Sequence, residues 1–172
     1  MSDPSTHTAI TTTGSAAVAE YLDGLGVAYE LVEHPPTTSA AAEADATQRP
    51  AGQVAKTVVL QYGLGYALAI VPASERLDLR KVRGLFGAPK DLRFATEAEI
   101  ARDFPALEVG AVPPLGPMLP MAEVIDRRLV AQSKILCAGG DHEHSIVLDP
   151  HDVVRLTGAT VADVCADPRS GS

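Results

Sequence analysis

The sequence has no tryptophan and few aromatic residues of any kind, which together make up 4% of the chain. Proteins that bind several unpaired bases need a platform of aromatic side chains, so the composition argues against that class. Only two cysteines are present, Cys137 and Cys165, and their spacing does not match a pair of metal ligands. We therefore expect both to be reduced thiols that pack in the interior.

Long hydrophobic runs and an excess of positive charge are also missing. No apolar run approaches the length of a membrane span, and the polar N-terminus lacks the pattern of a secretory signal. We therefore expect a cytoplasmic protein without a membrane partner. The formal net charge of −8 argues against DNA binding and against broad nucleic-acid binding, which depend on many contacts from Lys and Arg to phosphates. Local contact with one end of an RNA stays compatible with this charge.

Basic residues are nevertheless concentrated in one segment. Six of the 14 lysines and arginines fall within eighteen positions: Arg76, Arg80, Lys81, Arg83, Lys90 and Arg93. Such a cluster is typical of a solvated helix face, and it also fits a patch that binds phosphates. The sequence leaves both interpretations open.

The chain length of 172 residues and the hydrophobic content of 46% predict one globular domain. We expect it to span residues 14–166, with flexible ends at 1–13 and 167–172. Apolar periodicity and capping patterns predict helices over 14–22, 40–44, 78–85, 97–102 and 150–156, and a capping box at 160–163. Strands are predicted over 27–32, 56–62, 66–72, 91–95, 123–125, 134–138 and 145–148. Because much of the β structure comes in hairpins, we predict an α+β fold, with a mixed, mostly antiparallel sheet or open barrel surrounded by helices.

The clearest strand begins at Lys56 and is rich in β-branched residues, which suit a pleated surface. The segment 63–65 predicts a hairpin turn, and the return strand is almost wholly apolar, which indicates burial on both faces. A lysine at the start of a buried strand places its ammonium group at the rim of the sheet. There it is either a solvent-facing side chain or a functional cation.

The stretch 110–117, Gly-Ala-Val-Pro-Pro-Leu-Gly-Pro, has no charge and combines glycines with prolines. Proline fixes φ and lacks an N–H group, and glycine reaches backbone angles that other residues avoid. The stretch therefore predicts a stiff loop, which is either a structural turn or a site where preorganised amides oppose a ligand anion.

Other candidate groups have weaker spacing. His142 and His144 would share a face of a strand, but zinc needs three or four ligands, so we expect no metal. Cys137 lies close in sequence to His142, which fits either a Cys/His nucleophile or a buried strand cysteine. Three carboxylates could act as bases without any spacing that pairs them: Glu75, Asp126 and Asp149.

Taken in order, several segments resemble the YbaK/EbsC family, the prolyl-tRNA-synthetase-associated editing domain. The resemblance covers about 29–164, and its pieces are His34-Pro35 with Thr37-Thr38-Ser39 and Glu43-Ala44, Ala55-Lys56-Thr57, Ala69-Ile70-Val71-Pro72-Ala73 with Leu77-Asp78-Leu79, Ala95-Thr96, the loop from Gly110 to Gly116, Leu119-Pro120, Asp126 with Leu129, and Gly140 with His142 before Ser145-Ile146. Each piece is weak alone, and their order and spacing make the signal specific. The loop is of the Gly-Ala-x-Pro-Pro-x-Gly subtype rather than the Gly-Gly-x-Ser-Pro form, which leaves the amino-acid specificity open.

The resemblance implies a free-standing, cofactor-free deacylase that hydrolyses the ester of mischarged aminoacyl-tRNA. Its implied partners are the tRNA acceptor end and, as a further candidate, an aminoacyl-tRNA synthetase. The family's lysine corresponds to Lys56, which would contact the terminal adenosine or its phosphate. The family's G-x-x-x-P element corresponds to Gly110–Pro114, whose amides would oppose the oxyanion. The family mechanism is substrate-assisted, with a ribose hydroxyl that helps to activate water.

The remaining site residues are expectations about the pocket. We expect it to be lined by Thr37, Ser39, Val58, Ile70, Ala111, Val112, Pro113 and Gly140. His142 is either a polar pocket residue or a general base, because its ordinary pKa suits proton transfer near neutral pH. Two alternative functions stay open: a non-catalytic module that binds an aminoacyl or nucleotide end, and a small-ester or amide hydrolase that uses Cys137 with His142.

Overall fold

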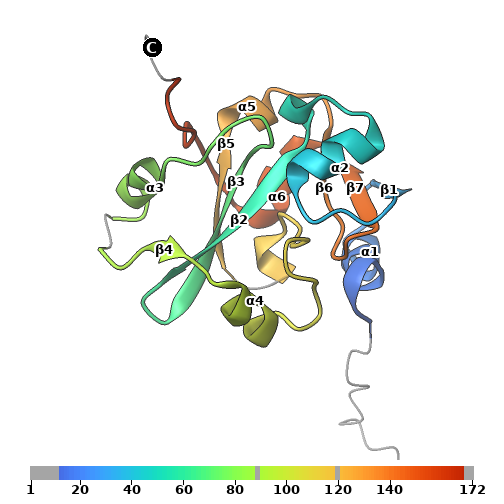
Figure 1. Ribbon diagram of the computed structural model, residues 1–172, viewed down its shortest axis with the longest axis horizontal. Helices are drawn as coiled ribbons and strands as arrows, with labels where there is room; N and C mark the ends of the chain where they lie inside the picture. The colour runs from blue at the N-terminus through green and yellow to red at the C-terminus, as the bar shows by residue number, and fades with distance from the viewer. Residues whose placement is uncertain (1–11, 88–89, 119–120, 169–172) are drawn as a thin grey trace, which may run out of the picture.

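Two β-sheets, one of five strands and one of three, form the framework of the computed structural model, which describes residues 12–87, 90–118 and 121–168 (Figure 1). The strands are β1 (Glu30–Glu33), β2 (Ala55–Tyr62), β3 (Gly65–Pro72), β4 (Arg93–Phe94), β5 (Ala122–Asp126), β6 (Ile135–Ala138), β7 (His144–Leu148) and β8 (Thr160–Ala162). The helices are α1 (Gly14–Gly24), α2 (Ala40–Thr47), α3 (Leu79–Leu85), α4 (Glu97–Asp103), α5 (Arg127–Val130) and α6 (Pro150–Thr157), with short 3₁₀ turns η1 (Ala51–Gln53) and η2 (Gly116–Met118). None of the described helices has the length and apolar character needed to cross a membrane.

The smaller sheet has the order β1-β7-β6 and is antiparallel throughout. The larger sheet has the order β4-β2-β3-β5-β8, in which β5 pairs parallel with both β3 and β8. A single parallel bridge between Val54 and Leu136 connects the two sheets. The mixed and antiparallel pairing with surrounding helices confirms the predicted α+β fold class.

The hairpin of β2 and β3 defines the two sides of the larger sheet. Because neighbouring residues of a strand point to opposite faces, Ala55 and Val59 pack in a core shared with the smaller sheet, while Leu60 packs on the other face beneath α3. Along β3, Leu68 and Ile70 face the shared core, and the alternate residues Ala67, Ala69 and Val71 face α3. The prediction that this strand is buried on both faces is confirmed.

Side-chain caps start most of the helices where the sequence predicted them. The Ser39 hydroxyl accepts a hydrogen bond from the amide of Ala42 at the start of α2. Thr96 and Glu99 form the predicted capping box of α4. Asp149 caps α6 ahead of the proline at its first position, and the left-handed Gly158 ends that helix.

The predicted capping box at 160–163 is wrong. Residues Thr160–Ala162 form strand β8 beside β5, with Val161 opposite Ile125. A Thr-x-x-Asp pattern only starts a helix if helix-forming residues follow, and here the β-branched pair fits an edge strand instead. The first strand is also shifted, since β1 covers Glu30–Glu33 rather than 27–32.

Candidate active site

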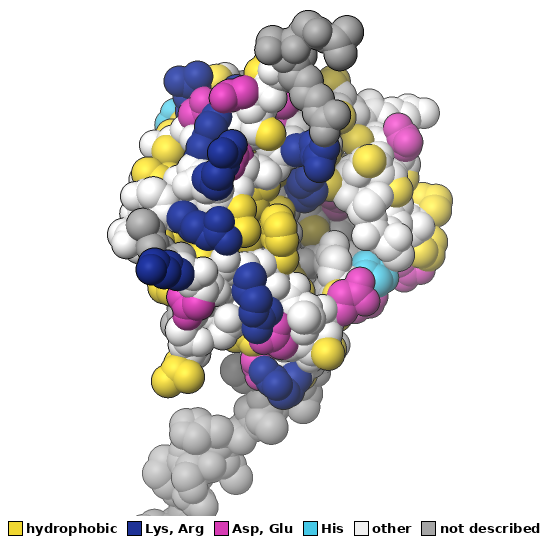
Figure 2. All heavy atoms as spheres, turned by 60° about the vertical axis from the view of Figure 1, so that its left-hand side comes forward, with side chains coloured by type: hydrophobic (Ala, Val, Ile, Leu, Met, Phe, Trp, Pro, Cys, Tyr) yellow, Lys and Arg dark blue, Asp and Glu magenta, His cyan; other side chains and the backbone are white. Residues whose placement is uncertain are grey.

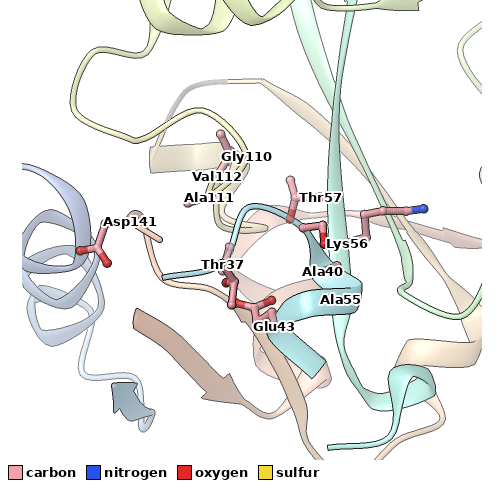
Figure 3. A pocket seen from close by; sticks show the side chains of 12 residues that line it. Thr37, Ala40, Glu43, Ala55, Lys56, Thr57, Gly110, Ala111, Val112 and Asp141 are labelled. Carbon is pink, nitrogen blue, oxygen red and sulfur yellow. The ribbon is translucent and has the colours of Figure 1, made fainter. Parts of the chain in front are cut away.

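A small cavity of about 40 Å³ lies between α2, the start of β2 and the Gly/Pro loop (Figure 3). A cavity of this size holds only a few water molecules or a small side chain. The lining residues are Thr37, Ser39, Ala40, Glu43, Ala55, Lys56, Thr57, Gly110, Ala111, Val112, Ala138 and Asp141. The cavity therefore brings together four of the predicted substrate-binding residues and two of the predicted catalytic ones.

The Gly/Pro loop contributes Gly110, Ala111 and Val112 to the lining of this cavity. Gly110 adopts a φ of +85°, which strongly favours glycine, and a Cβ atom there would lie 3.3 Å from the carbonyl oxygen of Thr38. The amide of Ala111 donates to the carbonyl of Glu108 at 3.0 Å. Within the described part of the chain, the amides of Gly110 and Val112 have no acceptor. These two N–H groups are the loop donors available to a ligand.

The turn between β6 and β7 holds the first half of the loop. The amide of Gly140 donates to the carbonyl of Ala111, and the amide of Glu108 donates to the carbonyl of Gly140, both at 3.0 Å. His142 contacts the Val109 carbonyl through Nε2 at 2.6 Å and the Glu108 carboxylate through Nδ1 at 3.0 Å. Neither Gly140 nor His142 lines the cavity, in contrast to the expectation, because both pack behind the loop.

Nε2 of His142 is hydrogen-bonded to the Val109 carbonyl, and Nδ1 lies beside the Glu108 carboxylate, so both ring nitrogens are directed at acceptors next to the loop. A general base needs a free nitrogen directed at the reacting water. The geometry instead makes His142 a residue that positions the loop.

The far end of the loop is held from β5. Oε1 of Glu123 accepts the amide of Gly116 at 3.0 Å, and Oε2 is buried without a partner among the described residues. Pro113 and Pro114 between the two anchored ends are buried. Burial raises the pKa of Glu123 to about 8, so its carboxyl group is protonated near neutral pH.

The start of β2 places two polar side chains on opposite sides of the strand. Thr57 is directed toward the loop, and its buried hydroxyl has no hydrogen-bond partner in the described structure (Figure 3). Lys56 is at the rim, where its side chain extends away from the cavity and Nζ donates to the Glu75 carbonyl at 3.2 Å (Figure 3). A lysine ammonium has three donors, so two stay available at this rim.

Two expected pocket residues on the β2–β3 hairpin do not line the cavity. Ile70 lies opposite Thr57 and is fully buried in the shared core, so it does not reach the cavity. Val58 follows Thr57 and therefore faces the other side of the sheet, toward α3.

Helix α2 contributes a buried carboxylate that sequence reasoning missed as a site residue. Glu43 is 6% exposed and accepts a hydrogen bond from the Ser145 hydroxyl, whose oxygen also lies 2.8 Å from Nε2 of His34. Residue types alone gave a weak signal, namely one glutamate on an alanine-rich helix that follows a Ser cap. Glu43 and His34 lie 102 and 111 positions from Ser145 in the sequence, so only the fold shows that these three side chains are in contact.

The alternative catalytic groups are placed elsewhere. Cys137 is fully buried in the shared core, and burial raises the pKa of its thiol well above the usual value, which disfavours the reactive thiolate. Asp126 and Asp149 cap α5 and α6.

His142 and His144 pair with different carboxylates, Glu108 and Asp141. Across the described ranges, no group of three or more His, Cys, Asp or Glu side chains is arranged to hold a metal ion.

A family model and a solved structure both relate this chain to aminoacyl-tRNA editing proteins. The model of the aminoacyl-tRNA editing domain family matches residues 34–156. A solved structure described as a candidate trans-editing enzyme for prolyl-tRNA synthetase is 32% identical, covers 89% of this chain and 97% of its own, and has a TM-score of 0.79. A chain from work on epitope grafting onto scaffold proteins (28% identity, 90% and 97% coverage, TM-score 0.79) and a hypothetical protein (28%, 87% and 99%, 0.78) are similar too. No curated protein matches the sequence.

Proposed function

Because the chain belongs to the aminoacyl-tRNA editing domain family, we propose that it is a trans-editing deacylase that hydrolyses the ester bond of mischarged aminoacyl-tRNA. The observation that carries this proposal is a small cavity lined by Gly110 and Val112, whose amides have no acceptor among the described residues. An ester carbonyl placed there develops negative charge as water attacks, and preorganised amides stabilise that charge. Removal of one such donor typically costs about 3–4 kcal/mol in the transition state.

The reaction needs no nucleophile from the protein. Water attacks the carbonyl carbon, and the bond to the ribose oxygen breaks. One proton of the water passes to that oxygen and the other to solvent, so the amino acid leaves as its carboxylate. The neighbouring ribose hydroxyl is the group that orients the water. The burial of Cys137 supports this substrate-assisted route, because the candidate thiol nucleophile is not accessible to an ester.

The basic side of the molecule supports a tRNA partner. Lys56 lies against the segment Ser74–Arg80, which lines a wide, open groove together with Ala166–Pro168. Figure 2 shows Lys and Arg side chains gathered around an apolar hollow on the side that carries α3 and β4. We propose that Lys56 contacts the terminal nucleotide and that Arg76 and Arg80 contact phosphates further along the acceptor arm, within an overall acidic protein.

The size of the cavity supports small aminoacyl groups as substrates. A pocket selects mainly by excluding larger side chains, since each methylene group changes binding by only about 1–3 kcal/mol. The similarity to the candidate trans-editing enzyme for prolyl-tRNA synthetase supports tRNA mischarged by that synthetase as the first substrate to test.

The test is release of radiolabelled amino acid from a panel of mischarged tRNAs, including tRNA specific for proline that carries alanine. We expect release from one or a few small aminoacyl esters, and full activity in Cys137→Ser. Loss of activity in folded Cys137→Ser would favour the Cys/His hydrolase instead. Binding of the tRNAs without release would favour a non-catalytic module.

Replacing the terminal adenosine by 2′-deoxyadenosine tests the ribose hydroxyl, and we expect slow release from that substrate.

A further inference from the structure

Glu43, Ser145 and His34 form a buried chain of polar groups that ends at the cavity. All three side chains are at most 8% exposed, although charged residues are rarely buried without a partner. Oε2 of Glu43 accepts from Ser145, and Oε1 has no partner among the residues that the structure describes. Glu43 lines the cavity, so its unpaired oxygen is the buried end of this chain that a ligand can reach.

The hydrogen bonds of the chain fit together in two proton arrangements. Nδ1 of His34 lies 2.8 Å from the Pro35 carbonyl, so that nitrogen carries a proton in either case. In one arrangement both ring nitrogens are protonated, so the imidazolium donates to Ser145, which donates to the Glu43 carboxylate. In the other, a protonated Glu43 donates to Ser145, which donates to Nε2. The chain therefore allows the buried carboxyl to change protonation while every link stays hydrogen-bonded.

The cavity offers acceptors but no cationic partner for Glu43. Lys56 extends away from the cavity, as Figure 3 shows, and its ammonium contacts Glu75 instead. The carboxylate of Asp141, the other acidic group in the lining, is already satisfied by the amides of Ser15 and Glu143 and by His144. Glu43 is thus the lining carboxylate with an oxygen to spare, and the Thr57 hydroxyl is a second unpaired acceptor.

We propose that Glu43 binds the α-ammonium group of the aminoacyl ester, with the Thr57 hydroxyl as a second acceptor. This inference rests on the proposed function and adds a substrate class to it: esters whose α-amino group is free and charged. Burial raises the pKa of Glu43, despite the opposing hydrogen bond from Ser145, and a nearby cation favours the carboxylate. Esters with an acylated amino group, such as peptidyl esters, are then poor ligands.

The inference can be tested on the wild-type protein by binding, independently of hydrolysis. The probes are 3′-deoxy-3′-(alanylamino)adenosine, whose amide linkage resists hydrolysis, and its lactyl counterpart, in which a hydroxyl replaces the ammonium. Titration calorimetry near neutral pH is expected to give at least 10-fold tighter binding of the alanyl probe. Equal affinity for the two probes, or no measurable binding of the alanyl probe, would overturn the inference.

Three variants then test whether the preference depends on Glu43. In Glu43→Gln the preference for the alanyl probe is expected to disappear, while the exposed carboxylate control Glu33→Gln keeps it. Ser145→Ala, which removes the group that orients Glu43, is expected to retain part of it. A Glu43→Gln protein that keeps the full preference would contradict the inference, and thermal melts verify that the variants are folded.

Kinetics separates this role from general-base catalysis and from failure of the proposed function. With alanyl-tRNA and lactyl-tRNA as substrates, Glu43→Gln is expected to raise KM for the alanyl ester alone. An equal fall in kcat for both esters would mean that Glu43 is a base, which overturns the inference. If the wild-type protein hydrolyses neither ester yet prefers the alanyl probe, the deacylase proposal fails and ammonium recognition stands.

Discussion

At the scale of single residues, the site depends on two positions whose chemistry is visible only in the fold. Thr57 keeps a buried hydroxyl without a partner among the described residues, and Gly110 has a backbone angle that strongly favours glycine. An unsatisfied buried hydroxyl destabilises a protein, so the position of Thr57 beside the cavity fits the proposed role of its hydroxyl as a partner for the substrate.

Thr57→Val exchanges this hydroxyl for a methyl group of similar size. Because the hydroxyl makes no hydrogen bond in the described structure, we expect the free energy of unfolding to stay the same or to rise by about 1 kcal/mol. The kcat/KM for deacylation is expected to fall about 10-fold, the value of one lost hydrogen bond to the substrate. Urea unfolding measures the change in stability, and single-turnover deacylation measures the change in kcat/KM. Thr57→Ser is the control that keeps the hydroxyl. A Val variant with normal kinetics would remove Thr57 from the site.

Gly110→Ala tests the loop geometry against a matched glycine. The new Cβ would sit 3.3 Å from the Thr38 carbonyl at a φ of +85°, so either the loop or the 37–39 segment must shift. We expect a loss of about 1–2 kcal/mol in stability and at least a 100-fold loss of deacylation. Gly63→Ala also has positive φ but meets no atom within 4 Å, at the tip of the β2–β3 hairpin. That control is expected to lose similar stability and keep its activity. Equal activity in both variants would contradict the role of the loop.

At this scale the sequence predicted the residue types near the chemistry better than their directions. The loop glycine, Thr37 and Ser39 line the cavity as expected, whereas Val58 faces α3 on the other side of the sheet. A strand shows one face to a ligand and hides the other, and which face it shows depends on pairing partners that a single strand does not specify.

At the scale of elements, the Gly/Pro loop is held at both ends by segments far from it in sequence. The turn between β6 and β7 fixes the first half, and Glu123 on β5 accepts the amide of Gly116. The loop was predictable from its own composition, because glycine and proline specify a stiff turn. Its anchors were not, because buried glutamate and the turn histidine have no local pattern that pairs them with a loop.

The raised pKa of Glu123 predicts a pH-dependent stability. Folded protein keeps the proton up to a pH of about 8, whereas an unfolded carboxyl loses it near 4.5, so the free energy of unfolding falls as pH rises between these values and levels off above 8. Tyr21 and Cys137 are the titratable neighbours, and both stay neutral across this range because their own pKa values are raised. Glu43 changes stability in the same direction.

Glu123→Gln imitates the protonated carboxyl and is expected to flatten the stability curve between pH 5 and 8. Urea unfolding at intervals from pH 5 to 9 measures it, with the exposed Glu97→Gln as the control that keeps the slope. Unchanged slopes in Glu123→Gln would show that this carboxyl is ionised in the folded protein at neutral pH.

At the scale of the whole molecule, the protein is acidic overall but has one basic side. The net charge of −8 disfavours broad RNA binding, so affinity depends on where the basic residues lie. Several members of the basic segment are already paired, Lys81 with Asp163 and Asp167 and Arg93 with Glu99. Arg76 and Arg80 are exposed beside the groove next to Lys56, and Arg80 has only a long contact of 3.7 Å with Asp78.

Reversing both charges, Arg76→Glu with Arg80→Glu, is expected to raise KM for tRNA at least 10-fold and to leave kcat nearly unchanged, because the cavity is not altered. The salt dependence of kcat/KM should weaken at the same time, since fewer counterions are released. Lys134→Glu changes an exposed lysine next to the smaller sheet and is the control for net charge. A control that weakens binding as much as the double variant would mean that only overall charge matters.

The overall architecture could be predicted to the level of hairpins and fold class. The β2–β3 and β6–β7 hairpins follow from short turns between apolar runs. The division into two sheets and the parallel pairing of β5 with β3 and β8 could not, because these contacts join distant segments and no turn specifies their register. The misassigned segment 160–163 belongs to this long-range part of the fold.

The most direct test of the account is single-turnover deacylation of the best mischarged tRNA by Lys56→Ala and by Lys134→Ala. Lys56 lies at the rim between the cavity and the basic groove, with two ammonium donors free for the terminal nucleotide, whereas Lys134 is exposed elsewhere. The account predicts at least a 100-fold loss of kcat/KM for Lys56→Ala and an unchanged value for Lys134→Ala. Normal deacylation by a folded Lys56→Ala protein would contradict it.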